Sequence, residues 1–294
     1  MAREAGVLSP RARTARVLLT GYALFIYLFL FAPIIILVLF SFNANQYASF
    51  PITGWTTAWY REVFGDYAIQ DALRTTLKVA AEVTVISVLL GTVAAFPLVR
   101  GRLRFASGLR VTMTVPIMIP GILIGISLLI LFTQVLHVEL DTRTAVIGQS
   151  LYTTPFVMLL VAARLEGFDR NLERAASDLG ANTFNRLRLV VLPLIFPAIL
   201  AGALFAFTLS FDEFVITYFI IGSSNTLPIY IYTQIKFGVT PEVNALASLV
   251  LISSILFISL AFLLPAGYRL ARRTARSAGQ RRSAVAPEAA AATD

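Results

Sequence analysis

Six long apolar runs constrain the fold of this chain more than any other feature. They lie at residues 17–40, 75–99, 111–135, 144–163, 189–210 and 244–264. Each is near the ~20 residues that an α-helix needs to cross about 30 Å of hydrocarbon. Because lipid offers no hydrogen-bond partners, and because the runs lack the alternation of barrel strands, helices are favoured. The sequence predicts an all-α integral membrane protein with six transmembrane helices.

The distribution of basic residues predicts the orientation of these helices. With the N-terminus inside, only Arg61, Arg74, Lys78, Arg143 and Lys236 of the 24 basic residues fall on or near the outer side. Such a bias follows the positive-inside rule. We therefore expect both termini and the loop at 164–188 to face the cytoplasm from the cytoplasmic (inner) membrane.

The same pattern divides the chain into four segments. Residues 1–16 read as a basic cytoplasmic tail, and 17–70 as the first transmembrane helix with an outer segment. The first run is too long for a signal-peptide core and lacks a small-residue cleavage site, so we expect an uncleaved helix. Residues 71–270 form the core with five helices, and the Ala-rich segment 271–294 is expected to be a disordered cytoplasmic tail.

Composition excludes several function classes. There is no cysteine and the single histidine is His137, so thiolate metal sites, cysteine nucleophiles and histidine clusters are excluded. The basic residues lie between apolar runs rather than along one face, which argues against nucleic acid despite a net charge of +8. No G-x-x-x-x-G-K-[ST] stretch occurs, so we expect no cofactor here and ATP bound by another chain.

The charged segment at 164–193 is the most informative part of the sequence. Its apolar residues recur at helical spacing, at Leu172, Ala175, Ala176 and Leu179. Gly180 suits a left-handed C-cap, and Asn182 or Thr183 can begin a second helix that leads into the fifth run. A solvated loop, a helix lying on headgroups and a docking element all fit this pattern, but the small alanines favour a protein partner.

This stretch, ERAASDLGANTFNRLRLVVLPLIFPAI, resembles the cytoplasmic coupling motif of permease subunits of type I ABC importers. The family pattern is an E-A-A triplet, three intervening residues and a glycine, followed by nine residues and I-x-L-P. Arg174 stands at the triplet's glutamate position, with Glu173 directly before it. The resemblance implies that the ATPase-coupling residues are Leu172, Glu173, Arg174, Ala175, Ala176, Asp178, Leu179 and Gly180.

Further similarity covers about residues 70–266. The stretches SFDEFVITYFI and TLPIYIYTQIKFGVTPEVNALASLVL resemble the second permease subunit of spermidine/putrescine importers. This resemblance implies the architecture of a type I ABC importer permease. It also implies a paralogous permease as heterodimer partner, a cytosolic ATPase dimer that binds ATP and Mg, and an extracytoplasmic substrate-binding protein.

Ionisable and aromatic residues near the membrane are candidates for the substrate pathway. A charge at membrane depth is costly, so a charged residue found there is a candidate for a functional role. The candidates are Asp212, Glu213, Glu82, Tyr152, Phe211 and Tyr218. Glu82 could instead pair with Lys78 four residues earlier, and the acids could simply be a solvated helix end. Carboxylates and aromatic faces together suit linear polyamines.

The sequence thus predicts a permease subunit, not an enzyme, that translocates polyamines and couples to a separate ATPase. An ABC importer permease for another small solute, such as iron, thiamine or an opine, is an alternative within the same class. An ion-coupled secondary transporter is a second alternative, although no inverted repeat or midplane coupling site is evident.

Overall fold

The computed structural model describes residues 10–45, 49–101, 106–256 and 259. The tail expected at 271–294 lies outside these residues, and so does the expected N-terminal tail up to residue 9. Residues 10–16 belong to the first helix, which therefore begins earlier than its apolar run.

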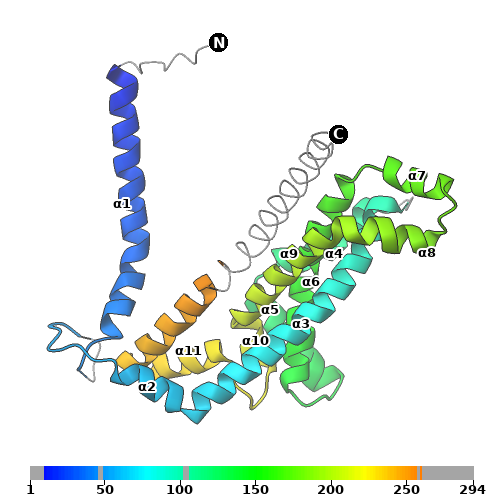
Figure 1. The fold of residues 1–294 in the computed structure, drawn as a ribbon. Helices are drawn as coiled ribbons and strands as arrows, with labels where there is room; N and C mark the ends of the chain where they lie inside the picture. Colours follow the sequence, from blue (N-terminus) through cyan, green and yellow to red (C-terminus); the bar gives the residue numbers. More distant parts are fainter. Residues whose placement is uncertain (1–9, 46–48, 102–105, 257–258, 260–294) are drawn as a thin grey trace, which may run out of the picture. The chain divides into compact units, whose positions relative to one another are not determined.

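The described residues form helices α1 to α11 and two π-helical turns (Figure 1). In chain order they are α1 Pro10–Phe40, α2 Ala58–Gly65, α3 Tyr67–Arg100, α4 Ala106–Met118, α5 Gly121–Ile130, the π turn η1 Leu131–Val135, α6 Thr142–Glu166, α7 Asn171–Asp178, α8 Thr183–Arg186, the π turn η2 Leu187–Val191, α9 Leu192–Phe211, α10 Val215–Ile220 and α11 Leu227–Phe237. A further apolar helix runs over Pro241–Leu256.

The all-helical prediction is confirmed, and a helix lies at every expected run. Four helices are long and apolar enough to cross a membrane: Thr14–Phe40, Tyr67–Arg100, Thr142–Glu166 and Thr183–Phe211. The third run is interrupted, because Arg110–Met118 and Gly121–Val135 meet at a bend of 100°. The described residues thus give four spans, or five if the bent pair counts as one. The expected six are not all matched.

The chain divides into two compact units, Met1–Asp66 with Ile231–Ile252 and Tyr67–Tyr230 with Ser253–Asp294. In the first unit, the segment after α1 is held by polar contacts of its aromatic residues. Trp59 donates from Nε1 to the Asn43 carbonyl at 2.8 Å, and the hydroxyls of Ser41 and Tyr60 lie 2.7 Å apart.

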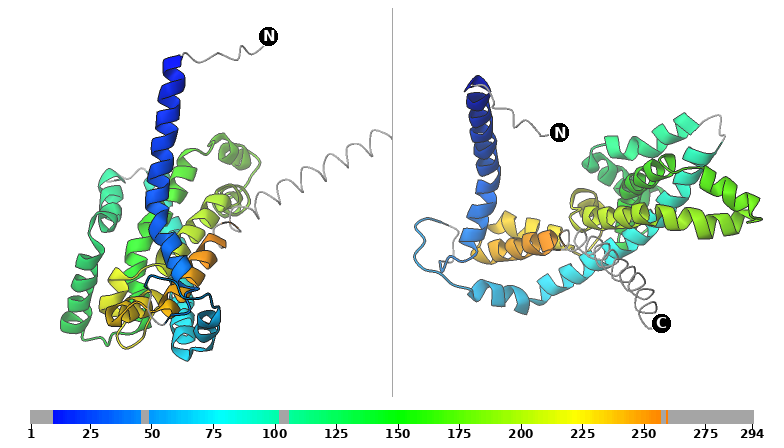
Figure 2. Two further views of the ribbon diagram at one scale, coloured as in Figure 1. Left: turned by 90° about the vertical axis from the view of Figure 1, so that its left-hand side faces the viewer. Right: turned by 45° about the horizontal axis from the view of Figure 1, so that its top comes forward.

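The second unit is built on α3, α6 and α9, which pack along one another (Figure 1 and Figure 2). Close helix contact depends on small residues, as is typical of membrane proteins. A Cβ added to Gly91 of α3 would lie 2.9 Å from the Met158 nitrogen and from the Val157 Cβ of α6. Around this crossing lies a buried apolar cluster of Ala95, Val157, Met158, Val161, Leu165, Val191, Ile195 and Ala206.

At the other end of α6, α5 and α10 form a second cluster that includes Leu128, Phe132 and Ile220. Asp141 begins α6 with a capping box, and its Oδ1 accepts hydrogen bonds from the backbone of Arg143 and Thr144. The Thr144 hydroxyl also donates to the Ile220 carbonyl at 2.5 Å. These contacts fix the short helix α10 against α6.

Candidate functional site

The segment predicted to be a cytoplasmic coupling element forms two short helices, α7 and α8. Helix α7 ends in a Schellman motif, in which Ala181 N donates to Ala176 O at 3.0 Å and Gly180 N donates to Ser177 O at 2.9 Å. Gly180 has φ +83°, the left-handed conformation expected of it. Asn182 caps α8 by accepting from Asn185 N at 2.8 Å. The predicted local structure is therefore confirmed.

An apolar surface of α7 is open in this chain. Leu172 is 48% exposed and Leu179 is 89% exposed, and Ala175 between them is also exposed. Phe184 at the start of α8 adds a ring that is 66% exposed. Sequence reasoning missed Phe184, because it follows the turn and lies outside the periodic stripe. The surface has the small and apolar character that fits a protein partner.

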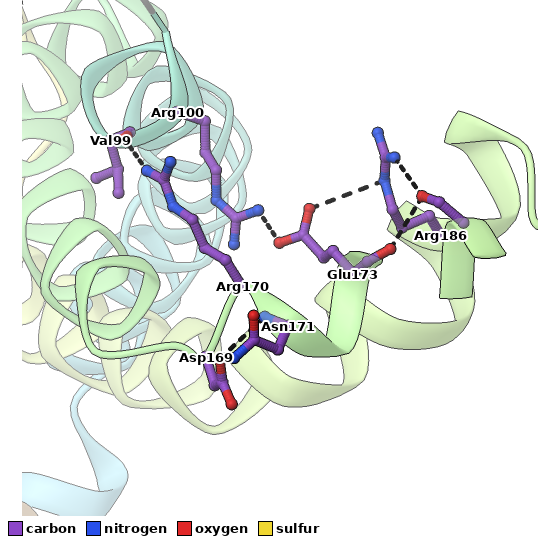
Figure 3. A network of polar contacts seen from close by, with 8 residues as sticks. Val99, Arg100, Asp169, Arg170, Asn171, Glu173 and Arg186 are labelled. Atoms are coloured by element: carbon purple, nitrogen blue, oxygen red, sulfur yellow. Dashed lines mark hydrogen bonds and ion pairs between the residues drawn. The ribbon is translucent and has the colours of Figure 1, made fainter. Parts of the chain in front are cut away.

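Arg174, which stands at the glutamate position of the family triplet, and Glu173 directly before it have opposite environments. Glu173 forms ion pairs with Arg100 at the end of α3 and with Arg186 of α8, the latter at 3.8 Å (Figure 3). Its side chain is only 16% exposed. Arg174 is exposed and its guanidinium lies 3.4 Å from the Asn171 side-chain oxygen. Glu173 thus points into the protein, which its position in the sequence did not reveal.

Further contacts hold this segment to the end of α3. Arg170 donates from Nη2 to the Val99 carbonyl at 3.1 Å (Figure 3), one of the carbonyl groups that a helix end leaves unpaired. The Arg100 guanidinium lies 5.2 Å from the centroid of the Phe168 ring, within the range of a cation–π contact. Arg100 is therefore held between an aromatic ring and the Glu173 carboxylate.

A second candidate site is a hollow of about 570 Å³ between two helix breaks. One wall is the bend between α4 and α5, residues 117–121, and the other is the break between α9 and α10, residues 212–214. Interrupted helices are tolerated at membrane depth only where the broken backbone is buried or lines a cavity. Two breaks that face one hollow mark it as the candidate pathway within this unit.

Glu213 stabilises the second break. Its Oε1 accepts from Ile216 N at 2.7 Å and its Oε2 accepts from Thr217 N at 2.9 Å. The Thr217 hydroxyl lies 2.5 Å from the same Oε2 and accepts a hydrogen bond from Gln149 Nε2 at 2.6 Å. The Gln149 carbonyl oxygen in turn accepts from Ser210. Both carboxylate oxygens of Glu213 are therefore engaged by the protein.

Asp212, one residue earlier, has different surroundings. It lines the hollow and is exposed to it, and its carboxylate has no hydrogen bond or ion pair within the described part of the chain. Partial burial raises the pKa of this carboxyl above its usual value. Asp212 is thus the acid that is available to a cation in the hollow.

The other candidate residues are only partly brought together. Tyr152 lines the hollow with Asp212, and Phe214 lines it as well. Phe211 instead stacks on Phe207, with ring centroids 6.1 Å apart, and Tyr218 packs on Phe214 at 5.4 Å. Neither Phe211 nor Tyr218 is among the residues that line the hollow.

Glu82 lies outside this site. It is exposed on α3, and it is not among the residues that line the hollow. The expected ion pair with Lys78 is not among the ion pairs of the described residues. The structure therefore supports neither of the two roles considered for Glu82.

Residues 87–276 match the family described as binding-protein-dependent transport system inner membrane component. The putrescine transport system permease protein PotI of Escherichia coli strain K12 is 38% identical over 242 residues, which cover 80% of this chain and 84% of PotI. The spermidine/putrescine transport system permease protein PotC of the same strain is 38% identical over 247 residues, covering 83% of this chain and 92% of PotC.

Solved structures agree on the fold. The crystal structure of a bacterial ABC transporter involved in the import of the acidic polysaccharide alginate superimposes with a TM-score of 0.69 at 17% identity. It covers 90% of this chain and 99% of that one. The predictions of a transport subunit rather than an enzyme, and of the ABC importer permease architecture, are confirmed. The chain belongs to the family of inner membrane components of binding-protein-dependent transport systems, as a permease subunit of an ABC importer.

Proposed function

We propose that this permease translocates polyamines such as putrescine and spermidine. The observation that carries the proposal is the carboxylate of Asp212, which has no protein partner within the described residues and lies in a hollow lined by Tyr152 and Phe214. An alkyl diamine needs a negative partner for each ammonium group and tolerates apolar walls along its methylenes. The two relatives at 38% identity, PotI and PotC, are named for putrescine and spermidine transport.

In this proposal the chain works as one subunit of a larger machine. A paralogous permease completes the pathway, a substrate-binding protein delivers the polyamine, and an ATPase dimer docks on the exposed surface of Leu172, Ala175, Leu179 and Phe184. Both termini and the loop at 164–188 face the cytoplasm, as the distribution of basic residues predicts.

Transport measurements on Asp212→Asn test the proposed substrate site. The permease is reconstituted in proteoliposomes with its partner subunits, and ATP-dependent uptake of labelled putrescine and spermidine is followed. We expect uptake to fall about tenfold or more, because a buried or half-buried ammonium group loses its charged partner at a cost of roughly 1.5–3 kcal/mol. The amount of ATPase that copurifies with the permease should not change.

Two further variants serve as references. Glu139→Gln removes an exposed acid from the loop before α6 and should leave uptake unchanged. Glu213→Gln should lower the thermal stability of the purified permease, because it weakens the cap of α10. Wild-type uptake by Asp212→Asn at equal expression would remove this acid from the pathway.

A further inference from the structure

Glu173 differs in its position from the apolar residues of the docking surface. Leu172, Ala175 and Leu179 are exposed, whereas Glu173 lies on the inner side of α7, between the helix and the protein. A carboxylate that served to bind another chain would be expected among the exposed residues. Its burial calls for a role within this chain.

The contacts of Glu173 join three elements. One oxygen pairs with Arg100, the last residue of α3, and the other pairs with Arg186 of α8 (Figure 3). Ser177, one turn later on α7, donates to the Glu173 carbonyl at 3.0 Å and accepts from Arg186 at 2.9 Å. The carboxylate thus ties α7 to the following helix and to a transmembrane helix at once.

Arg100 depends on this carboxylate. Its side chain is 19% exposed, and its Nε and Nη2 atoms have no hydrogen-bond partner among the described residues. Glu173 is the carboxylate with which it pairs there. Removing one partner of a largely buried ion pair is far more damaging than replacing both, because a charge is left buried and uncompensated.

Helix α3 is well placed to pass on a displacement. It packs along α6 and α9, and at Gly91 its backbone approaches α6 so closely that a Cβ would not fit. A movement of the end of α3 must therefore be shared by its neighbours. Packed helices have discrete arrangements rather than continuous ones, so such a movement can switch the unit between states.

We infer that Glu173 is a positioning residue that clamps α7 to the end of α3, so that a displacement of α7 by the ATPase is transmitted to the transmembrane helices. Glu173 does not itself contact the ATPase. This inference rests on the proposed function, in which the exposed surface of α7 is the docking surface. Arg174, which stands at the family's glutamate position, is left exposed on that loop.

A double-mutant cycle in the reconstituted transporter tests the clamp. Glu173→Gln, Arg100→Gln and the double variant are compared for polyamine taken up per ATP hydrolysed and for ATPase that copurifies with the permease. Each single variant should lower the polyamine taken up per ATP hydrolysed (the transport ratio) about tenfold, which is within the typical range of coupling between two sites. The amount of ATPase that copurifies should stay at the wild-type level. The double variant should be no worse than the worse single variant, because both remove the same interaction.

Two controls keep the outcomes distinct. Glu166→Gln removes the partner of Arg110 in an exposed pair at 2.5 Å and should leave the transport ratio unchanged. Arg100→Lys keeps the charge and should retain most of the ratio. The clamp is wrong if Glu173→Gln releases the ATPase, or if the losses of the two single variants multiply in the double variant.

The proposed docking surface has its own measurement. Ala175→Arg places a long charged side chain on the exposed surface of α7 and should release the ATPase. Retention of the ATPase by Ala175→Arg would refute the docking surface, whereas the cycle between Glu173 and Arg100 would still report whether these two residues act together.

Discussion

Asp212 and Glu213 are neighbours in the chain, but their carboxylates have different surroundings. Glu213 folds back over the first turn of α10 and accepts three hydrogen bonds from Ile216 and Thr217. Such capping contacts are typically worth about 1 kcal/mol each. Asp212 points into the hollow without a protein partner within the described residues. Glu213 therefore stabilises the first turn of α10, whereas the carboxylate of Asp212 is open to the hollow.

The raised pKa of Asp212 predicts the pH dependence of uptake. Burial favours the neutral carboxyl, so the anion that binds an ammonium group is lost as the pH falls through a value above the ordinary 3.8. Glu213 is the other carboxylate in the lining, and its oxygens are already engaged. Initial uptake should thus decline on acidification of the outer medium and recover on return to neutral pH.

Asp212→Asn provides the control for this measurement. The residual uptake of this variant should not decline with the same midpoint, because its amide does not titrate. An identical pH profile for wild type and Asp212→Asn would assign the dependence to another group, such as one in the binding protein.

At the scale of elements, the loop at 164–188 shows which features follow from neighbouring residues and which follow from contacts between distant segments. The spacing of its apolar residues predicts α7, Gly180 predicts where α7 ends, and the pair Asn182 and Thr183 predicts where α8 begins. The environment of Glu173 was not predicted, because its partner Arg100 is 73 residues away in sequence. Contacts between distant segments leave no periodic signal.

Gly180 offers a test of how far the local geometry of α7 matters. At φ +83° an L-residue is strained, while a Cβ would meet no atom within 4 Å, so Gly180→Ala should cost about 1–2 kcal/mol through backbone strain alone. Gly180→Pro should be worse, since proline also removes the hydrogen bond to Ser177 and requires a negative φ. Transport should fall in the order wild type, Gly180→Ala, Gly180→Pro.

The measurement is ATPase copurification together with uptake in proteoliposomes. Gly108→Ala is the matched control, because that glycine lies in α4 with equally open surroundings and without a positive φ. Similar losses for Gly108→Ala and Gly180→Ala would argue against a role of the left-handed turn.

At the scale of the second unit, the close packing of α3, α6 and α9 supports the broken pair α4 and α5 and the short helix α10. Helices α3, α6 and α9 are held together over an apolar cluster, and small residues at their crossings bring the backbones near one another. The broken pair α4 and α5 and the short α10 lie against this frame and enclose the hollow. The rigid part of the unit therefore positions its irregular part.

Gly91→Leu should disrupt this frame. A side chain at Gly91 meets the Met158 backbone nitrogen, which cannot yield as a flexible side chain could, so we expect a loss of about 3 kcal/mol or more. The thermal midpoint of the purified permease in detergent measures this effect. Val93→Leu is the control, since Val93 is 69% exposed and has room for another methylene. Equal midpoints for both variants would contradict the close approach.

The sequence by itself determined the helical class, the places of the helices and the local structure of the coupling segment, because apolar length, capping residues and glycine act over a few neighbours. It also narrowed the candidate residues to a short set of acids and aromatics. Only the tertiary structure decided which contacts they make: Asp212 and Tyr152 line one hollow, Glu213 bonds Thr217, which Gln149 also bonds, and Glu173 pairs with Arg100. Those contacts depend on the way in which the long helices pack against one another, and this packing is a property of the whole unit.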